Sequence, residues 1–111
     1  MVKWKISVVL TKLTLSAIKH TMKIALLREA RPLAHNENVE LFDSIDYLDI
    51  EELSELYAIV MVGLLESPQE FGSFKKYARE KGFQSVDTLW NNESLGSAME
   101  RGCELLELKT I

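Results

Sequence analysis

The residues that most often carry chemistry are scarce in this chain and are not spaced for a joint task. The two histidines are His20 and His35, and the single cysteine is Cys103. Neither histidine stands in a metal-ligand spacing of the HExxH type, and Cys103 has no cysteine partner for a zinc site. A Cys–His pair is formally possible, but a cysteine on an apolar helical stripe is more often a small core residue. We therefore expect no catalytic residue, no metal ion and no other cofactor.

Carboxylates are the one abundant reactive class, and five of them gather around residue 50: Asp46, Asp49, Glu51, Glu52 and Glu55. Such a group could bind a cation or supply an acid–base pair. It lacks the alternating ligands and the central glycine of an EF-hand. Because acids near a helix N-terminus are stabilised by the helix dipole, the sequence favours a solvated helix face instead.

Charge is divided unevenly along the chain. Residues 1–32 hold seven basic side chains and one acidic, residues 33–70 hold ten acidic and no basic, and the remainder holds six of each. The simplest interpretation is that the basic first helix lies near the acidic middle; the alternative is that the acidic segment captures a basic partner. The net charge of −4 and the absence of an arginine cluster argue against nucleic-acid binding.

Length and composition indicate one ordinary domain. The chain has 111 residues, 47% of them hydrophobic, which suffices for a core without staples. A lone cysteine fits a reducing compartment, and no stretch resembles a signal peptide or approaches the ~20 apolar residues that cross a bilayer. We expect a cytoplasmic protein without membrane contact.

The first residues alternate apolar and polar side chains, with the apolar set Val2, Trp4, Ile6, Val8 and Leu10. This period of two predicts an extended N-terminal arm over residues 1–12, followed by a single helical domain over 13–111. The alternative is that these residues form the first turns of a helix.

Two elements are predicted before residue 48. A helical period runs over 15–31, with Thr14 or Ser16 as a cap and Pro32 as the stop. The connection over 32–48 is apolar enough to hold a short helix at 39–46.

The next helix carries the clearest pattern in the sequence. Asp49 and Glu52 form a capping box, and Leu48 and Leu53 are placed as a hydrophobic staple. No polar side chain occurs from residue 58 to 65, so the helix over 50–66 is predicted to be the central element of the core.

Residues typical of helix starts and stops then predict two further helices. Ser67 begins a second capping box with a proline at the first helical position, opening a helix over 68–81 that stops at Gly82. Ser85 is predicted to cap a short helix that ends at Asn91.

The last helix is predicted to start at Asn92 or Ser94. Glycines at 96 and 102 lie inside it and would each cost roughly 1 kcal/mol relative to alanine, which suggests close approach to neighbouring helices. The fold class is therefore all-α, with four to five short helices packed around the central one.

The stretch from Ile50 to Leu106 resembles a family of small bacterial proteins known as the domain of unknown function 3775 family. The resemblance rests on an apolar helix with an internal glycine (56–63), an aromatic helix (74–80) and a closing segment (89–105). It covers about 80% of the chain when the helix at 15–31 is included. The chain departs from the family at Asn91-Asn92-Glu93 and by its N-terminal arm. The resemblance implies a bacterial, all-helical protein and supplies no activity.

Three functions remain open at this stage. The first is a non-enzymatic interaction protein that self-associates as a dimer through the arm and an apolar helical surface. Its candidate interaction residues are Trp4, Ile6, Val8, Asp49, Glu52, Glu55, Ile59 and Val62. The second is a small phage- or plasmid-type regulator whose acidic surface binds a basic protein. The third is a small-ligand binder or enzyme, which requires convergent polar groups in a pocket.

Overall fold

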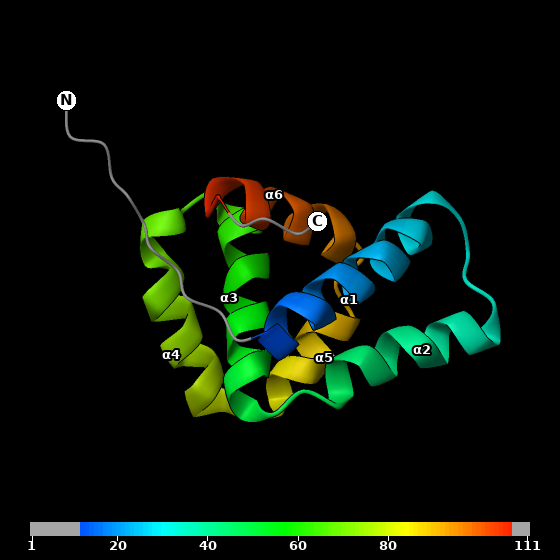
Figure 1. Ribbon diagram of the computed structural model, residues 1–111, viewed down its shortest axis with the longest axis horizontal. Coiled ribbons are helices and arrows are strands. Elements are labelled where there is room, and N and C mark those ends of the chain that lie inside the picture. The colour runs from blue at the N-terminus through cyan, green and yellow to red at the C-terminus, as the bar shows by residue number, and fades with distance from the viewer. Residues whose placement is uncertain (1–11, 108–111) are drawn as a thin grey trace.

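The computed structural model describes residues 12–107 and shows an all-helical chain (Figure 1). The predicted fold class is confirmed, and no strand occurs among these residues. The elements are α1 (Lys12–Ala30), α2 (His35–Asp46), α3 (Ile50–Leu65), the 3₁₀ turn η1 (Pro68–Glu70), α4 (Phe71–Lys81), α5 (Gln84–Trp90) and α6 (Leu95–Leu105). The described part holds six α-helices, which is α3 and five others, within the expected four to five helices around a central one. The predicted arm lies outside the described residues.

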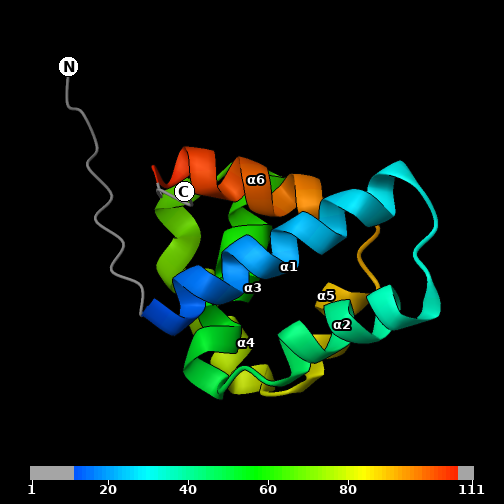
Figure 2. The ribbon, with the colours of Figure 1, turned by 45° about the vertical axis from the view of Figure 1, so that its right-hand side comes forward.

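Helix α3 packs mainly against α6 and α4 and also contacts α1, α5 and η1. Helix α1 lies between α6 and α2, and α2 in turn contacts α5 (Figures 1 and 2). The buried apolar side chains form one cluster to which all six helices contribute. Within the described part of the chain, no helix combines the length and the apolar character needed to cross a membrane.

Helix α2 is the largest departure from the prediction, because it begins at His35 instead of residue 39. Its N-cap, Ala34, has no side chain that could accept a hydrogen bond. The start of α2 is stabilised instead by Glu37 within the helix. Its carboxylate accepts a hydrogen bond from the Ala34 backbone N–H at 2.9 Å and forms an ion pair with Arg31. The sequence rule looks for a polar residue at the cap itself and so misses this start.

Helix α1 ends at Ala30, just before Pro32, as predicted. It begins at Lys12, which places Thr14 and Ser16 inside the helix rather than at its cap. The predicted caps are therefore wrong.

The capping box of α3 is confirmed in both directions. The Asp49 carboxylate accepts from the Glu52 backbone N–H at 2.8 Å, and the Glu52 carboxylate accepts from the Asp49 backbone N–H at 3.1 Å. Leu48 and Leu53, the predicted staple pair, are both buried in the core cluster. This start fixes the entry angle of the most buried helix of the fold.

The caps predicted at Ser67 and Ser85 are both wrong. Ser67 precedes a 3₁₀ turn rather than a helical turn, and Ser85 lies inside α5. Both side chains are buried, and neither hydroxyl has a hydrogen-bond partner among the described residues. The stop at Gly82 is confirmed, since this glycine follows α4 with a φ of 64°.

The close approach predicted at the glycines of α6 is confirmed. A Cβ atom on Gly96 would lie 2.6 Å from the backbone nitrogen of Leu26 in α1, and one on Gly102 would collide with the backbone oxygen of Ile59 in α3. Gly63 in α3 faces α6 in the same way, against the backbone of Ala98. Helices α1, α3 and α6 therefore meet backbone to backbone, where only glycine fits.

Candidate functional site

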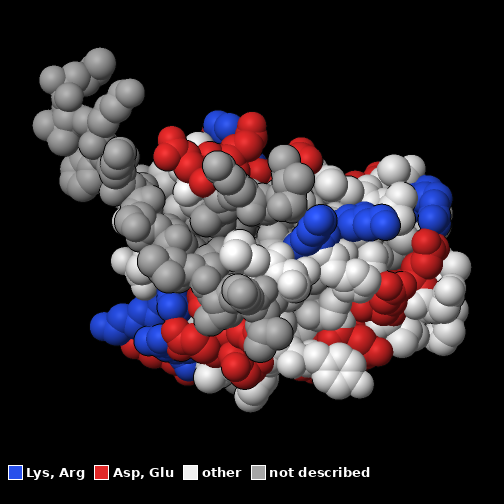
Figure 3. Space-filling view, viewed as in Figure 1, with Lys and Arg blue, Asp and Glu red and all other residues white. Residues whose placement is uncertain are grey.

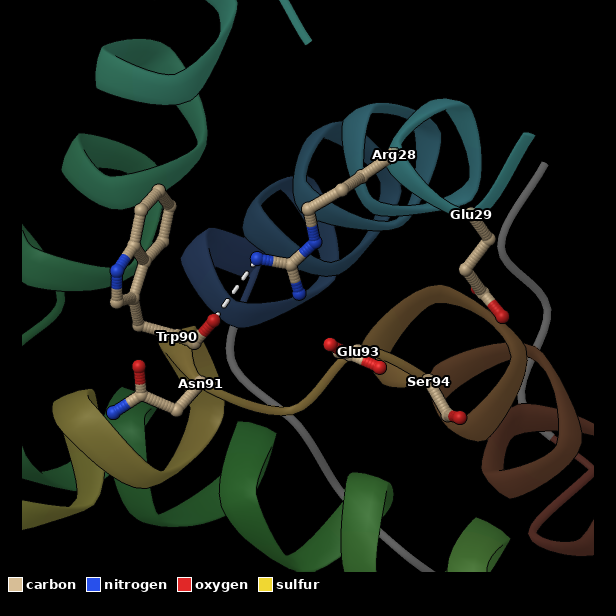
Figure 4. A pocket seen from close by; sticks show the side chains of 6 residues that line it. All are labelled: Arg28, Glu29, Trp90, Asn91, Glu93 and Ser94. Carbon is tan, nitrogen blue, oxygen red and sulfur yellow. Dashed lines mark hydrogen bonds between the residues drawn. The ribbon is translucent and has the colours of Figure 1, made fainter. Parts of the chain in front are cut away.

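An open groove of about 630 Å³ lies between α1, α5 and the start of α6 (Figure 4). We call it the α1–α5–α6 groove. Its lining residues are Arg28, Glu29, Trp90, Asn91, Glu93 and Ser94. The volume falls within the range of small-molecule sites, so this is where a ligand-binding function would be located.

Arg28 crosses the groove to the C-terminal end of α5. Its guanidinium donates to the backbone oxygens of Trp90 at 2.9 Å and Asn92 at 2.6 Å, and lies 5.5 Å from the centre of the Trp90 indole ring. Partial burial lowers the pKa of Arg28, while Glu29 and Glu93 oppose that shift. A cation is favoured at a helix C-terminus, where carbonyl groups lack helical partners, so this side chain serves the fold.

The neighbouring Glu29 performs the complementary task for α6. Its carboxylate accepts from the backbone N–H of Ser97 at 2.8 Å and from the Ser97 hydroxyl at 2.6 Å. Ser97 is the third residue of α6, so Glu29 satisfies a helix N-terminus from a different helix. Two adjacent residues of α1 thus hold the end of α5 and the start of α6, and both charged side chains that α1 contributes to the groove bind backbone groups.

The histidines and the cysteine do not meet. His20 on α1 lies 3.1 Å from Glu40 on α2, His35 is exposed at the start of α2, and Cys103 is buried in the core. Burial, with a contribution from Glu100, raises the pKa of Cys103 to about 11, so the thiol is protonated at neutral pH and is a poor nucleophile. Among the described residues, no three His, Cys, Asp or Glu side chains are grouped so that they could hold a metal ion.

The acidic residues of α3 do not form the solvated face that the sequence suggested. Glu52 is 7% exposed and Glu55 is 2% exposed. Glu51 remains at the surface, where it pairs with Arg79 and, at 2.7 Å, with Lys75, both on α4. These hydrogen bonds lower the pKa of Glu51 to about 2. The prediction is wrong here because α4 packs along α3 and brings basic side chains onto its acidic start.

The uneven charge along the chain is balanced in two ways. Helix α1 does lie against α2, where Arg31 pairs with Glu37. Acids at the two ends of α3 are paired with the last third of the chain instead, as Glu51 with Arg79 on α4 and Glu66 with Arg101 on α6 show. The acidic middle is therefore divided between two sets of basic neighbours.

The predicted interaction surface on α3 is not a surface of this chain. Ile59 and Val62 are fully buried, and Glu52 and Glu55 are nearly so. Asp49 alone is exposed, and it is the helix cap. The correction has a clear cause, since α6 and α4 cover both flanks of the apolar run. The remaining predicted residues, Trp4, Ile6 and Val8, lie outside the described part of the chain.

A different exposed face carries both apolar and acidic side chains. It lies on α2, opposite the buried Leu41 and Ile45. We call it the α2 outer face. Its members recur at helical spacing: Val39, Glu40, Asp46 and Tyr47 are exposed, and Asp43 between them is half-buried. Figure 3 shows acidic side chains along this edge of the molecule.

Two exposures set the α2 outer face apart. The side chain of Tyr47 is 83% exposed, the highest value among the large apolar residues described, and Val39 is 45% exposed. Among the described residues, the carboxylates of Asp43 and Asp46 form no ion pair. The helix predicted at 39–46 already contained residues 39, 43 and 46 at helical spacing, but the sequence did not indicate which side of that helix packs against α1 and α5.

Comparisons with family models, with curated proteins and with solved structures found no match to this chain. The resemblance of residues 50–106 to the domain of unknown function 3775 family therefore stays a prediction.

Proposed function

We propose that this protein is a non-enzymatic protein–protein interaction module that self-associates, as a dimer, in the bacterial cytoplasm. The observation that carries the proposal is the α2 outer face, where Tyr47 and Val39 stand exposed among three carboxylates. Apolar side chains that are rimmed by charges are typical of protein contact surfaces, and tyrosine is enriched at such contacts. The α1–α5–α6 groove supports the non-enzymatic part, because Arg28 and Glu29 are already bound to backbone groups.

Sedimentation velocity over a range from low to high micromolar tests the proposal. We expect the weight-average mass of the full chain to rise toward twice 12.7 kDa with concentration. The Tyr47→Ser variant should shift this rise to higher concentration. The matched control is Phe83→Ser, which removes another exposed aromatic side chain, from the connection between α4 and α5. A mass that stays at one chain throughout would reject self-association.

A second candidate is the capture of a basic protein by the same face. It is favoured by the charge of the segment, since residues 33–70 contain no basic residue. Such a complex would weaken strongly between low and high salt, because exposed charges are screened beyond about 10 Å at 0.1 M ionic strength. A pull-down whose recovered partner is indifferent to salt would remove this candidate.

A further inference from the structure

We propose that the α2 outer face binds residues 1–11 of a second copy of the chain. This inference rests on the proposed self-association and names the surface and the segment that form it. It follows from three observations: the position of the acids on α2, the composition of residues 1–11, and the direction in which the chain enters α1.

The acids of the α2 outer face work against the helix that carries them. Asp43 and Asp46 lie in the last turn of α2, which contains no basic residue. The C-terminus of a helix carries partial negative charge, so an acid there costs stability, typically 0.3–1 kcal/mol. Stability of the fold therefore gives no reason for these residues, whereas a cationic segment lying across this end of α2 would be attracted both to them and to the helix terminus.

Residues 1–11 have the complementary composition. They carry Lys3 and Lys5 and no acidic residue, and the lysines alternate with apolar side chains that include Trp4 and Ile6. The α2 outer face offers apolar Val39 and Tyr47 between carboxylates. The ring of Tyr47 can pack against an apolar side chain such as Trp4, or it can bind a lysine ammonium over its face. Eleven extended residues span up to about 36 Å, more than the length of a 12-residue helix.

The path of the chain favours a second copy over the same copy. Helices α1 and α2 run antiparallel, since Thr21 meets Ser44 near one end of the pair and Arg31 meets Glu37 near the other. The start of α1 at Lys12 therefore lies beyond the C-terminal end of α2, and the preceding residues would have to reverse direction to lie on the α2 of the same copy. Residues 1–11 contain no glycine, proline, asparagine or aspartate, the residues that most readily form tight turns. A neighbouring molecule requires no reversal.

A charge exchange between two full-length variants tests this arrangement by sedimentation velocity. The arm variant is Lys3→Glu/Lys5→Glu, and the face variant is Asp43→Lys/Asp46→Lys. Each alone sets like charges against each other, and we expect the dissociation constant of its dimer to rise about 100-fold or more. In a one-to-one mixture the acidic arm meets the basic face and the basic arm meets the acidic face, so the mixed dimer should form with nearly the affinity of the original chain.

Matched controls carry the same change of charge elsewhere. Lys76→Glu/Lys81→Glu and Glu80→Lys/Glu100→Lys alter exposed residues of α4 and α6, and both should dimerise like the original chain. Circular dichroism checks that every variant is folded. The face variant is expected to fold well, because lysines in the last turn of a helix are favoured.

The outcomes separate the inference from the proposed function. A dimer that persists in both variants would overturn the inference and leave self-association in place through another surface. An original chain that stays monomeric at all concentrations would reject both. Loss of the dimer in each variant without recovery in the mixture would also overturn the inference, since it would show that the two regions do not meet between copies.

Discussion

Helices α2 and α3 are adjacent acidic helices that contain no lysine or arginine, yet the fold uses their carboxylates in opposite ways. On α3, Glu52 closes a capping box and Glu51 is paired with Arg79 and Lys75. On α2, Asp43 and Asp46 stand at the unfavourable end of the helix, with no ion pair among the described residues. The same charge in the sequence thus stabilises one helix and slightly destabilises the next.

This difference arises from what covers each helix. Helix α3 is flanked by α4 and α6, which supply arginine and lysine side chains to the acids at its two ends. Helix α2 contacts α1 and α5 on one side only, and its other side faces solvent. An acidic run in a sequence therefore identifies an interaction surface only after the packing of its helix is known.

The largest effect is expected where α3 and α6 meet. Gly102→Ala would drive a Cβ atom into the backbone oxygen of Ile59, which cannot move aside like a flexible side chain. We expect a loss of about 3 kcal/mol or more in the free energy of unfolding, measured by urea denaturation.

The control for that experiment is Gly72→Ala in α4. A Cβ atom there would meet nothing within 4 Å, so alanine should raise the free energy of unfolding by about 0.5–1 kcal/mol. Equal effects at the two glycines would contradict the backbone contact between α3 and α6.

The starts of the two helices provide the next comparison. Asp49→Ala removes the carboxylate that caps α3 and should cost about 1–2 kcal/mol of unfolding free energy. The opposite change at the start of α2, Ala34→Ser, adds a hydroxyl where the N-cap has no side-chain acceptor and has extended backbone angles. It should gain about 0.5–1 kcal/mol. Thermal unfolding with matched baselines measures both, and the absence of any gain from Ala34→Ser would show that Glu37 alone already satisfies that helix end.

Local signals in the sequence were enough to predict most of the fold. The capping box at Asp49, the stop at Gly82 and the glycines of α6 each depend on a few neighbouring residues, and the structure confirms all three. The predictions failed where a side chain acts at a distance. Ser67 and Ser85 were expected to cap helices, but tertiary packing buries them.

The candidate sites were harder to predict than the fold, and for the same reason. Arg28 and Glu29 bind residues more than 60 positions away in the sequence, so no local pattern could reveal their roles. Ile59 and Val62 were predicted to face outward because an apolar helix without visible partners suggests an interface. Their burial depends on where α6 and α4 pack, which periodicity alone does not specify.

A smaller effect on the free energy of unfolding is expected when Glu51 on α3 is protonated at low pH. The pKa of Glu51 is about 2 in the folded chain and about 4.3 in an unfolded one, so its pairing contributes stability above pH 5 that is lost as the pH falls toward 2. Because the side chain is 40% exposed and screened by water, we expect less than about 1 kcal/mol. Urea unfolding at pH 7 and pH 3 should show a smaller difference for Glu51→Gln than for the original chain. An unchanged difference would mean that other carboxylates, such as Glu37, carry the acid sensitivity.

The smallest change in stability is expected on α2, and it is the most informative for function. Asp46→Asn removes a negative charge from the C-terminal end of the helix, so the free energy of unfolding should rise by a few tenths of a kcal/mol at low salt. The matched control is Glu52→Gln in the first turn of α3. A carboxylate is favoured at a helix N-terminus, so the same loss of charge should lower the free energy of unfolding there. If Asp46→Asn also weakens self-association in sedimentation velocity, stability and association change in opposite directions at one residue. If the Asp46 carboxylate stabilised the fold, Asp46→Asn would lower the free energy of unfolding. If it belongs to an interaction surface, Asp46→Asn should raise that free energy and weaken association, because the charge then attracts a partner and does not stabilise the helix.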